Sequence, residues 1–534
     1  MEKENFFKCF ERKIGINTKI EKIWFWICFC LLLLYLEGII IVQNIYYDKN
    51  IFITIFCAIG VVLLSFVGIF ICSKIEFKIN KKDSKKKNIM LSISVFCITL
   101  LFYLLWQWAY YPGSFSYDSI SQLEQVISGN YNNWHPVLHT WIFFFIPYKI
   151  FNNVAVIVTF QIILFGFAVT YLCSVLYKNG LSKFIIFFAW LYIILNPNTS
   201  YIMLYPWKDS AFSIFALIWF VQLIQIYMTK GIWLKKWYNN IAFTIVAFLA
   251  LEMRHNAILL IFPIFIILCL TFKKEIIKSL VISGISIIIS TLILHLIIFK
   301  LLNVELPDRR VLETVGMPMT VISNAYVNDR TVLSNECKEF MDSLATQEQW
   351  NRSYNKEYGF NSIKFVTSTE LGYKVDSEGY KNIFKYMFEA FINSPKYALE
   401  GFIELTRMVW GTYGNANWKI PYGISDNNYN IQYYNGNELL NKITTLYGNN
   451  KLVLKIFNYL GTVICVIMFA AIGKIGKGNL YKIFIIVPPL IYNFGTMLLL
   501  TGNDFRFFHL NFLIIIPILY IIFVNNEEKE KKTS

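Results

Sequence analysis

The chain has 534 residues, of which 56% are hydrophobic and 18% aromatic, and it carries a formal net charge of +15. Runs of roughly 17–25 apolar residues recur along nearly its whole length, as bilayer-spanning helices require. This composition excludes a soluble globular protein. The lysines lie in short loops between the apolar runs, where they set membrane topology and do not indicate nucleic-acid binding. The sequence therefore predicts an all-α polytopic membrane protein that contacts membrane lipid and no nucleic acid.

The apolar runs predict about twelve transmembrane helices, and the basic loops orient them. The predicted spans lie near residues 23–43, 51–72, 89–110, 154–177, 182–198, 210–229, 237–253, 257–272, 277–300, 452–472, 480–500 and 510–524. With the N-terminus inside, the predicted cytoplasmic segments hold 27 Lys and Arg residues, whereas the short loops opposite hold about five. This asymmetry follows the positive-inside rule, and it predicts a multi-pass protein of the cell (cytoplasmic) membrane with both termini in the cytoplasm. The many Ile, Asn and Lys residues are typical of AT-rich bacterial genomes.

The predicted chain has four parts. They are an N-terminal two-span hairpin with a basic cytoplasmic loop (1–88), a transmembrane catalytic core with the external loop 112–153 (89–301), one mainly helical extracytoplasmic domain (302–450), and three C-terminal spans with a cytoplasmic tail (451–534).

Three shorter helices are predicted outside the spans. The apolar run 137–151 is too short to cross a bilayer, and counting it as a span would put downstream lysines outside, so we expect it in the outer interface. Ser394-Pro395 predicts a side-chain-capped helix start, with Gly411 as its end. A further helix is predicted over 437–447.

Polar residues that could carry chemistry gather in four loops on the predicted external side. The first loop contains Asp118, followed by His135-Pro136-Val137-Leu138. The other three loops contribute the pairs Lys208 and Asp209, Arg254 and His255, and Asp504 and Arg506. If the fold closes these loops on one another, acids, cations and imidazoles meet at one site.

This inventory suits a reaction between an anionic lipid headgroup and a hydroxyl acceptor. A carboxylate can take the proton from an attacking hydroxyl, and Arg and Lys can stabilise a departing phosphate. Arg254 follows a short span, and insertion of Arg into a bilayer costs roughly 2.5–3.5 kcal/mol, so we expect a partner or a use for it.

Structural roles are the alternatives for the same residues. Asp118 could cap a helix, and His135-Pro136 could begin one. Lys208 and Asp209 could form a local ion pair. Arg254 could pair with Glu252, and Arg506 could extend to the interface from a span end.

The order of these features resembles the GT-C superfamily of membrane glycosyltransferases, nearest to uncharacterised bacterial members with a Pro-Gly-x-x-x-x-Asp first external loop. Asp118 matches the acidic residue of that loop, within Pro112-Gly113-Ser114-Phe115-Ser116-Tyr117-Asp118. His135-Pro136-Val137-Leu138 is similar to the His-Pro element of the family's surface helix. Asp209 matches a second acidic residue two spans later. The resemblance covers roughly residues 89 to 300.

The resemblance implies a GT-C-like fold and transfer of a sugar from a polyprenyl-phosphate donor to a glycan, lipid or protein acceptor of the cell envelope. It implies Asp118 as base or metal-binding group, with Asp209 as a second ligand for a possible Mg or Mn ion. Binding of substrate or lipid phosphate is expected from His135, Lys208, Asp209, Arg254, His255, Asp504 and Arg506. Two other functions stay open, an O-antigen polymerase or ligase and a lipid or solute transporter.

Overall fold

The structure is a computed structural model that describes residues 6–47, 51–79, 85–306, 310–356, 358–364, 370–412, 422–434, 437–476 and 480–524. Within these ranges the chain is helical and its β contacts are isolated bridges. The predicted all-α class is therefore confirmed. The predicted cytoplasmic tail, 525–534, lies outside the described residues.

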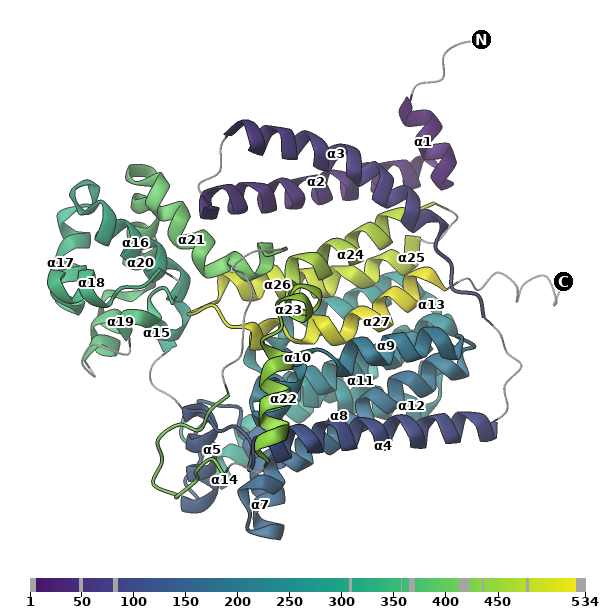
Figure 1. Cartoon of the computed structure of the whole chain (residues 1–534), viewed down its shortest axis with the longest axis horizontal. Helices are drawn as coiled ribbons and strands as arrows, with labels where there is room; N and C mark the ends of the chain where they lie inside the picture. The colour runs from purple at the N-terminus through teal and green to yellow at the C-terminus, as the bar shows by residue number, and fades with distance from the viewer. Residues whose placement is uncertain are drawn as a thin grey trace.

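Most helices lie side by side in one bundle (Figure 1). They are α2 (Lys19–Tyr47), α3 (Ile51–Lys74), α4 (Lys85–Ala109), α8 (Val154–Lys178), α9 (Lys183–Ile194), α10 (Pro197–Leu204), α11 (Lys208–Met228), α12 (Trp237–Met253), α13 (Ile258–Leu292), α23 (Lys451–Phe457), α24 (Leu460–Gly473), α25 (Leu480–Ile483), α26 (Val487–Leu498) and α27 (Leu510–Phe523). Preceding α2, α1 spans Phe6–Ile14.

Nine helical segments of the described chain are long and apolar enough to cross a membrane, or eleven if each of two bent pairs counts as one span. The bent pairs are α9 with α10 and α23 with α24, with bends of 56° and 42°. The protein is thus a multi-pass membrane protein. The predicted count of about twelve also included 237–253. That segment is α12, whose 17 residues extend about 25 Å, less than the roughly 30 Å of a hydrocarbon core.

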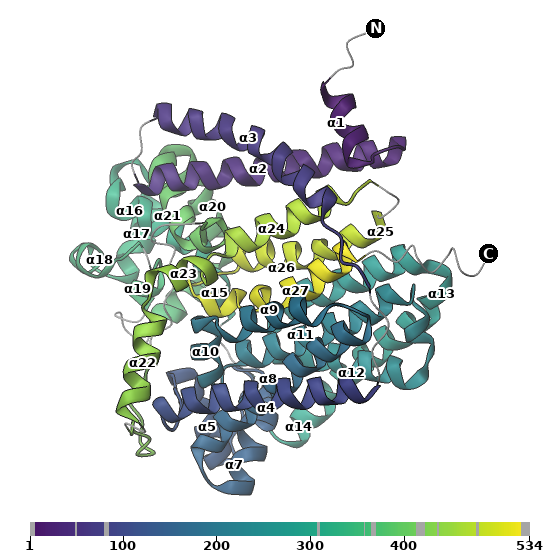
Figure 2. The same cartoon turned by 45° about the vertical axis from the view of Figure 1, so that its right-hand side comes forward.

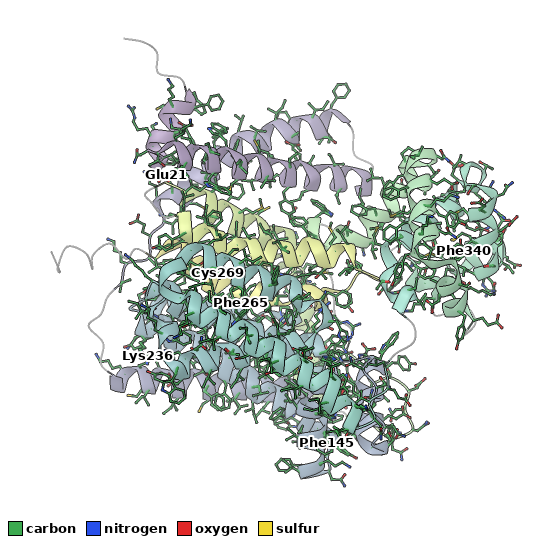
Figure 3. All side chains as sticks on the ribbon, turned by 180° about the vertical axis from the view of Figure 1, so that it is seen from behind. Glu21, Phe145, Lys236, Phe265, Cys269 and Phe340 are labelled. Atoms are coloured by element: carbon green, nitrogen blue, oxygen red, sulfur yellow. The ribbon has the colours of Figure 1, made fainter. Side chains whose placement is uncertain are left out.

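Both described ends of the chain lie at one end of the bundle, and a separate helical lobe lies at the other, which we call the lobe end. Glu21 and Lys236 lie at the first end, and Phe145 and Phe340 at the lobe end (Figure 3). The short helices α5 (Tyr117–Ser128), α7 (Ile146–Phe151) and α14 (Phe299–Leu301) are also at the lobe end (Figures 1 and 2). Along the chain, α6 (Val137–His139) and η1 (Thr140–Phe145) lead directly into α7, and η4 (Ile293–Ile298) leads into α14. The predicted short helix over 137–151 is confirmed as the run from α6 to α7.

The helical lobe has its own apolar core. Its elements are α15 (Arg310–Thr314), α16 (Gly316–Asn328), η5 (Arg330–Val332), α17 (Asn335–Leu344), α18 (Gln347–Ser353), α19 (Asn361–Lys364) and α20 (Leu371–Asn393). Trp350 is fully buried in this core and donates its indole N–H to the carbonyl of Met341 at 3.0 Å.

Helix α21 (Pro395–Trp410) connects the lobe core to the bundle core. The helix starts and ends as predicted, but Ser394 makes no capping hydrogen bond. Its hydroxyl instead donates to Asp329 at 3.4 Å, because its backbone does not take the extended conformation that aims a capping side chain at the first turn.

The segment 422–434, which we call the strap, pairs with the first external loop. The Phe115 N–H donates to the Gly423 carbonyl at 3.1 Å, and the Ser425 N–H donates to the Phe115 carbonyl at 2.8 Å. After the strap comes α22 (Glu438–Gly448), which lies within one residue of the predicted 437–447 at each end, with Asn437 as its side-chain cap. The predicted domain 302–450 is thus divided, because the lobe core draws on residues 312–398 while α22 packs against the bundle.

The lobe contacts the segment before α27 through a glycine. A Cβ on Gly316 would meet the Thr501 backbone and lie 2.6 Å from the Leu500 carbonyl oxygen. We expect Gly316→Ala to lower the free energy of unfolding by about 1–3 kcal/mol, because overpacking forces the backbone apart. Thermal unfolding of the purified protein in detergent measures this loss. Gly284→Ala is the control, since nothing lies within 4 Å of its added Cβ; equal midpoints for the two variants would contradict the prediction.

Candidate functional site

Arg506 lies among three carboxylates that come from distant parts of the chain. Its Nη1 donates to Asp118 at 3.0 Å, and its Nε is 3.0 Å from Asp504 and 3.8 Å from Asp209. The Arg506 side chain is 20% exposed, and Asp209 is almost completely buried. A guanidinium presents its donors in a rigid planar fork, so one side chain can hold several acids in a fixed arrangement. We call these four residues, with Arg254 and Lys208, the charged cluster.

Local helix geometry places each of the three acids. Asp118 and Asp209 are the second residues of α5 and α11, where free N–H groups and the helix dipole favour negative charge. Asp504 caps η7 (Phe505–Phe508) by accepting the Arg506 N–H at 3.0 Å. The acids therefore stabilise three helix starts at the lobe end.

Arg254, at the turn between α12 and η3 (His255–Ala257), forms an ion pair with Asp209. Its Nε donates to Asn256 at 2.5 Å. The alternative pairing with Glu252 is wrong. Glu252 instead accepts hydrogen bonds from Thr291 at 2.9 Å and His295 at 3.1 Å. The desolvated Arg254 thus obtains its compensating charge from a helix that is distant in sequence.

Aromatic rings contact the guanidiniums of both Arg506 and Arg254. The Arg506 guanidinium lies 4.9 Å from the Trp207 ring and 5.2 Å from the Phe507 ring, and Arg254 lies 4.8 Å from Phe507. Tyr205 stacks on the other face of Trp207, with ring centroids 4.0 Å apart. Cation–π contacts of this kind leave the guanidinium edges free to donate to carboxylates.

Lys208 makes no hydrogen bond or ion pair within the described part of the chain, although it lies close enough to Asp118 and Asp209 to interact with them electrostatically. The predicted alternative of a local ion pair with Asp209 is therefore wrong, because Asp209 pairs with Arg254. Lys208 thus lies beside the acids without a direct contact to either of them.

The two predicted histidines are placed differently. His135 is buried, with Nε2 3.9 Å from Asp118, and its Nδ1 has no hydrogen-bond partner among the described residues. Burial, reinforced by the charge of Lys208, lowers the pKa of His135 from 6.5 to about 3, so the ring is neutral near pH 7. His255 is exposed, and no ion pair connects it to the acids in the part of the chain described.

Asp118 is ionised in this setting. Burial opposes its negative charge, but Arg506, with a smaller contribution from Lys208, holds the pKa of its carboxyl below the ordinary value of 3.8. Its side chain is 35% exposed, whereas Asp209 is enclosed. Asp118 is therefore an acid that a substrate can reach.

The two acids proposed as ligands for a divalent metal, Asp118 and Asp209, both lie close to Arg506. Within the described residues, no group of three or more His, Cys, Asp or Glu side chains could hold a metal ion. Arg506 contacts Asp118 and approaches Asp209, so a guanidinium takes the position between the two carboxylates.

Two site residues were not foreseen from the sequence. Trp207 donates its indole N–H to Ser116 at 2.7 Å, so it connects the start of α5 with Arg506 and with the start of α11. Gln122 accepts from Thr140 at 3.1 Å and lies 2.6 Å from His139, which fixes the helix that follows His135. Trp207 precedes Lys208 directly, but a Trp near a span end is also an ordinary interfacial residue.

We expect Trp207→Ala to lower the free energy of unfolding by about 3–5 kcal/mol, because the ring is enclosed on both faces. Trp207→Phe should lower it less, since only the indole N–H is lost, at about 0.5–1.5 kcal/mol. Chemical denaturation in detergent measures both variants. Trp108→Ala is the matched control because Trp108 is 51% exposed on α4; a Trp207→Ala loss no larger than the control's would refute this role.

Acid should destabilise the wild type through His135. Its folded pKa of about 3 lies below the ordinary 6.5, so the unfolded chain binds the proton more tightly and stability falls as pH drops below about 6.5. We expect His135→Gln to lose less thermal stability than the wild type between about pH 7.5 and pH 5. Melting curves at the two pH values test this, and an undiminished loss in the variant would show that His135 does not titrate as described.

Comparison with protein-family models, with curated proteins and with solved structures found no match for this chain. The functional assignment consequently depends on the charged cluster and its position in the membrane protein.

Proposed function

We propose that the protein is a membrane glycosyltransferase that transfers a sugar from a polyprenyl-phosphate donor to a hydroxyl group of a cell-envelope glycan, lipid or protein. The observation that carries the proposal is the contact of Asp118 with Arg506 beside the uncommitted ammonium of Lys208. A reachable carboxylate and two cations stand together at the lobe end of a membrane bundle. The positive-inside asymmetry supports an extracytoplasmic location for this end.

In this reaction the acceptor oxygen attacks the anomeric carbon of the sugar, and a new C–O bond forms. The bond between that carbon and the phosphate oxygen breaks, and the electron pair leaves with the phosphate. Asp118 takes the proton of the acceptor hydroxyl, because it is ionised and accessible. All atoms and charges are thereby accounted for without a redox partner.

The three cationic side chains have different roles in this reaction. Lys208 has no ion pair within the described chain, so its ammonium can bind the donor phosphate as a point charge. Arg506 is already shared among three acids, and it can still turn donors toward a departing phosphate as Asp118 becomes neutral. Arg254 is committed to Asp209 and compensates the charge of that buried acid.

We expect Asp118→Asn to abolish sugar transfer, with a loss of about 10²–10⁴-fold, because the general base is gone while size and hydrogen bonding are kept. Protein in nanodiscs is assayed with a polyprenyl-phosphate-linked single-sugar donor, and products are read by mass spectrometry. Glu124→Gln is the matched control, since Glu124 is an exposed acid of the same helix.

Full transfer by Asp118→Asn would remove Asp118 from the mechanism. Transfer only from a polymerised lipid-linked donor would instead support the polymerase or ligase function. Thermal unfolding of each variant distinguishes loss of chemistry from loss of folding.

A further inference from the structure

Helix α22 is bound to the bundle along one polar face. Thr444 donates its hydroxyl to Tyr110 at 3.1 Å, and the Thr445 hydroxyl lies 2.9 Å from the same tyrosine oxygen. Asn441 donates to the carbonyl of Ala109 at 3.4 Å, and Gly448 packs closely on the Tyr201 ring. These positions share one side of the helix, so α22 is fixed in rotation against α4 and α10.

The opposite face of α22 is apolar and exposed. Leu439, Ile443 and Leu446 follow at the i, i+4, i+7 spacing of one helix face, and they are 66%, 51% and 73% exposed. Leu452 and Ile456 of α23 are exposed as well. Five large aliphatic side chains in two consecutive helices are therefore more than half exposed within the described chain.

The orientation of α22 indicates what covers this face. In Figures 1 and 2, α22 runs across the lobe-end terminus of α4, roughly perpendicular to the long axes of the spanning helices. Because those axes approximate the membrane normal, α22 lies in the plane of the membrane. A helix of this kind, apolar on one side and lying in the plane, is suited to the boundary between lipid headgroups and acyl chains.

The apolar face also continues a surface that the bilayer covers. On α4, Leu101 and Trp108 are exposed, and Trp108 directly precedes Ala109, whose carbonyl accepts from Asn441 of α22. Exposed tryptophans mark the interfacial level of spanning helices. Lys442, Lys451 and Lys455 are exposed on the same two helices, where their amines can reach headgroup phosphates.

We propose that the apolar face of α22 and α23, formed by Leu439, Ile443, Leu446, Leu452 and Ile456, is embedded in the headgroup–acyl boundary of the leaflet at the lobe end. The strap leads directly into α22 and pairs with Phe115, three residues before Asp118. Lipid contact at α22 thereby sets the depth of the first external loop in the membrane. The inference is independent of the chemistry proposed for the charged cluster.

The test places a photo-crosslinking residue, p-benzoylphenylalanine, at Ile443 or at Leu446 of the full chain in nanodiscs of phosphatidylethanolamine and phosphatidylglycerol. After illumination, intact-mass spectrometry should show phospholipid adducts at both positions. Glu348 is the control position, because it is exposed on α18 in the helical lobe. We expect at least about tenfold more lipid adduct at Ile443 than at Glu348.

Equal lipid labelling at Ile443 and Glu348 would overturn the proposal, and so would crosslinks from Ile443 to a second copy of the chain in place of lipid. A second measurement guards against misfolding. Ile443→Asp should lower the thermal midpoint in nanodiscs more than Glu348→Lys does, because a charge must then enter the interface. An unchanged midpoint would argue against immersion of this face.

Discussion

The Arg506 guanidinium connects three chain segments that are distant in sequence. Asp118, Asp209 and Asp504 begin three different helices, and each would repel the other two if the positive charge were absent. Trp207 and Phe507 contact the guanidinium, and the Asp209 side chain is almost completely buried, so water screens that interaction least. Breaking a buried pair leaves an uncompensated charge, which costs more than the pair itself contributes. The lobe end of the bundle is therefore organised around one side chain.

The three acids differ in burial and in partners, and these differences suggest a structural role for Asp209 and a chemical role for Asp118. Asp209 is enclosed and pairs with Arg254, which makes it the fixed counter-charge of a desolvated arginine. The Asp118 side chain is 35% exposed, shares Arg506, and lies close to Lys208 and to the neutral ring of His135. A hydroxyl and an anionic group can approach Asp118 together, whereas Asp209 offers no such access. Identical side chains thus take different parts because of burial and partners.

Hydropathy predicted most of the fold because a bilayer leaves a chain few alternatives to apolar helices. It does not decide α12, whose 17 residues are shorter than a full span, and it could not show that 302–450 divides between two cores. The loops that meet were foreseen from charge and predicted sidedness. The sequence did not predict that Arg254 pairs with Asp209 instead of Glu252. It also did not predict that Lys208 lacks a direct contact with the acids, or that Trp207 contacts Arg506. Pairing partners depend on distances in the folded protein, and the spacing of residues along the sequence does not give these distances.

The glycine contact between lobe and bundle has a mechanical consequence. Gly316 packs on Thr501, and Gly502 packs on Asn361 of the lobe, within a few residues of Arg506. A hinge between the lobe and the bundle would need loosely packed backbone at their contact. Gly316 and Gly502 instead pack closely there. A rotation of the lobe toward the charged cluster would therefore also displace Arg506. The position of the lobe is therefore coupled to the segment that carries Arg506.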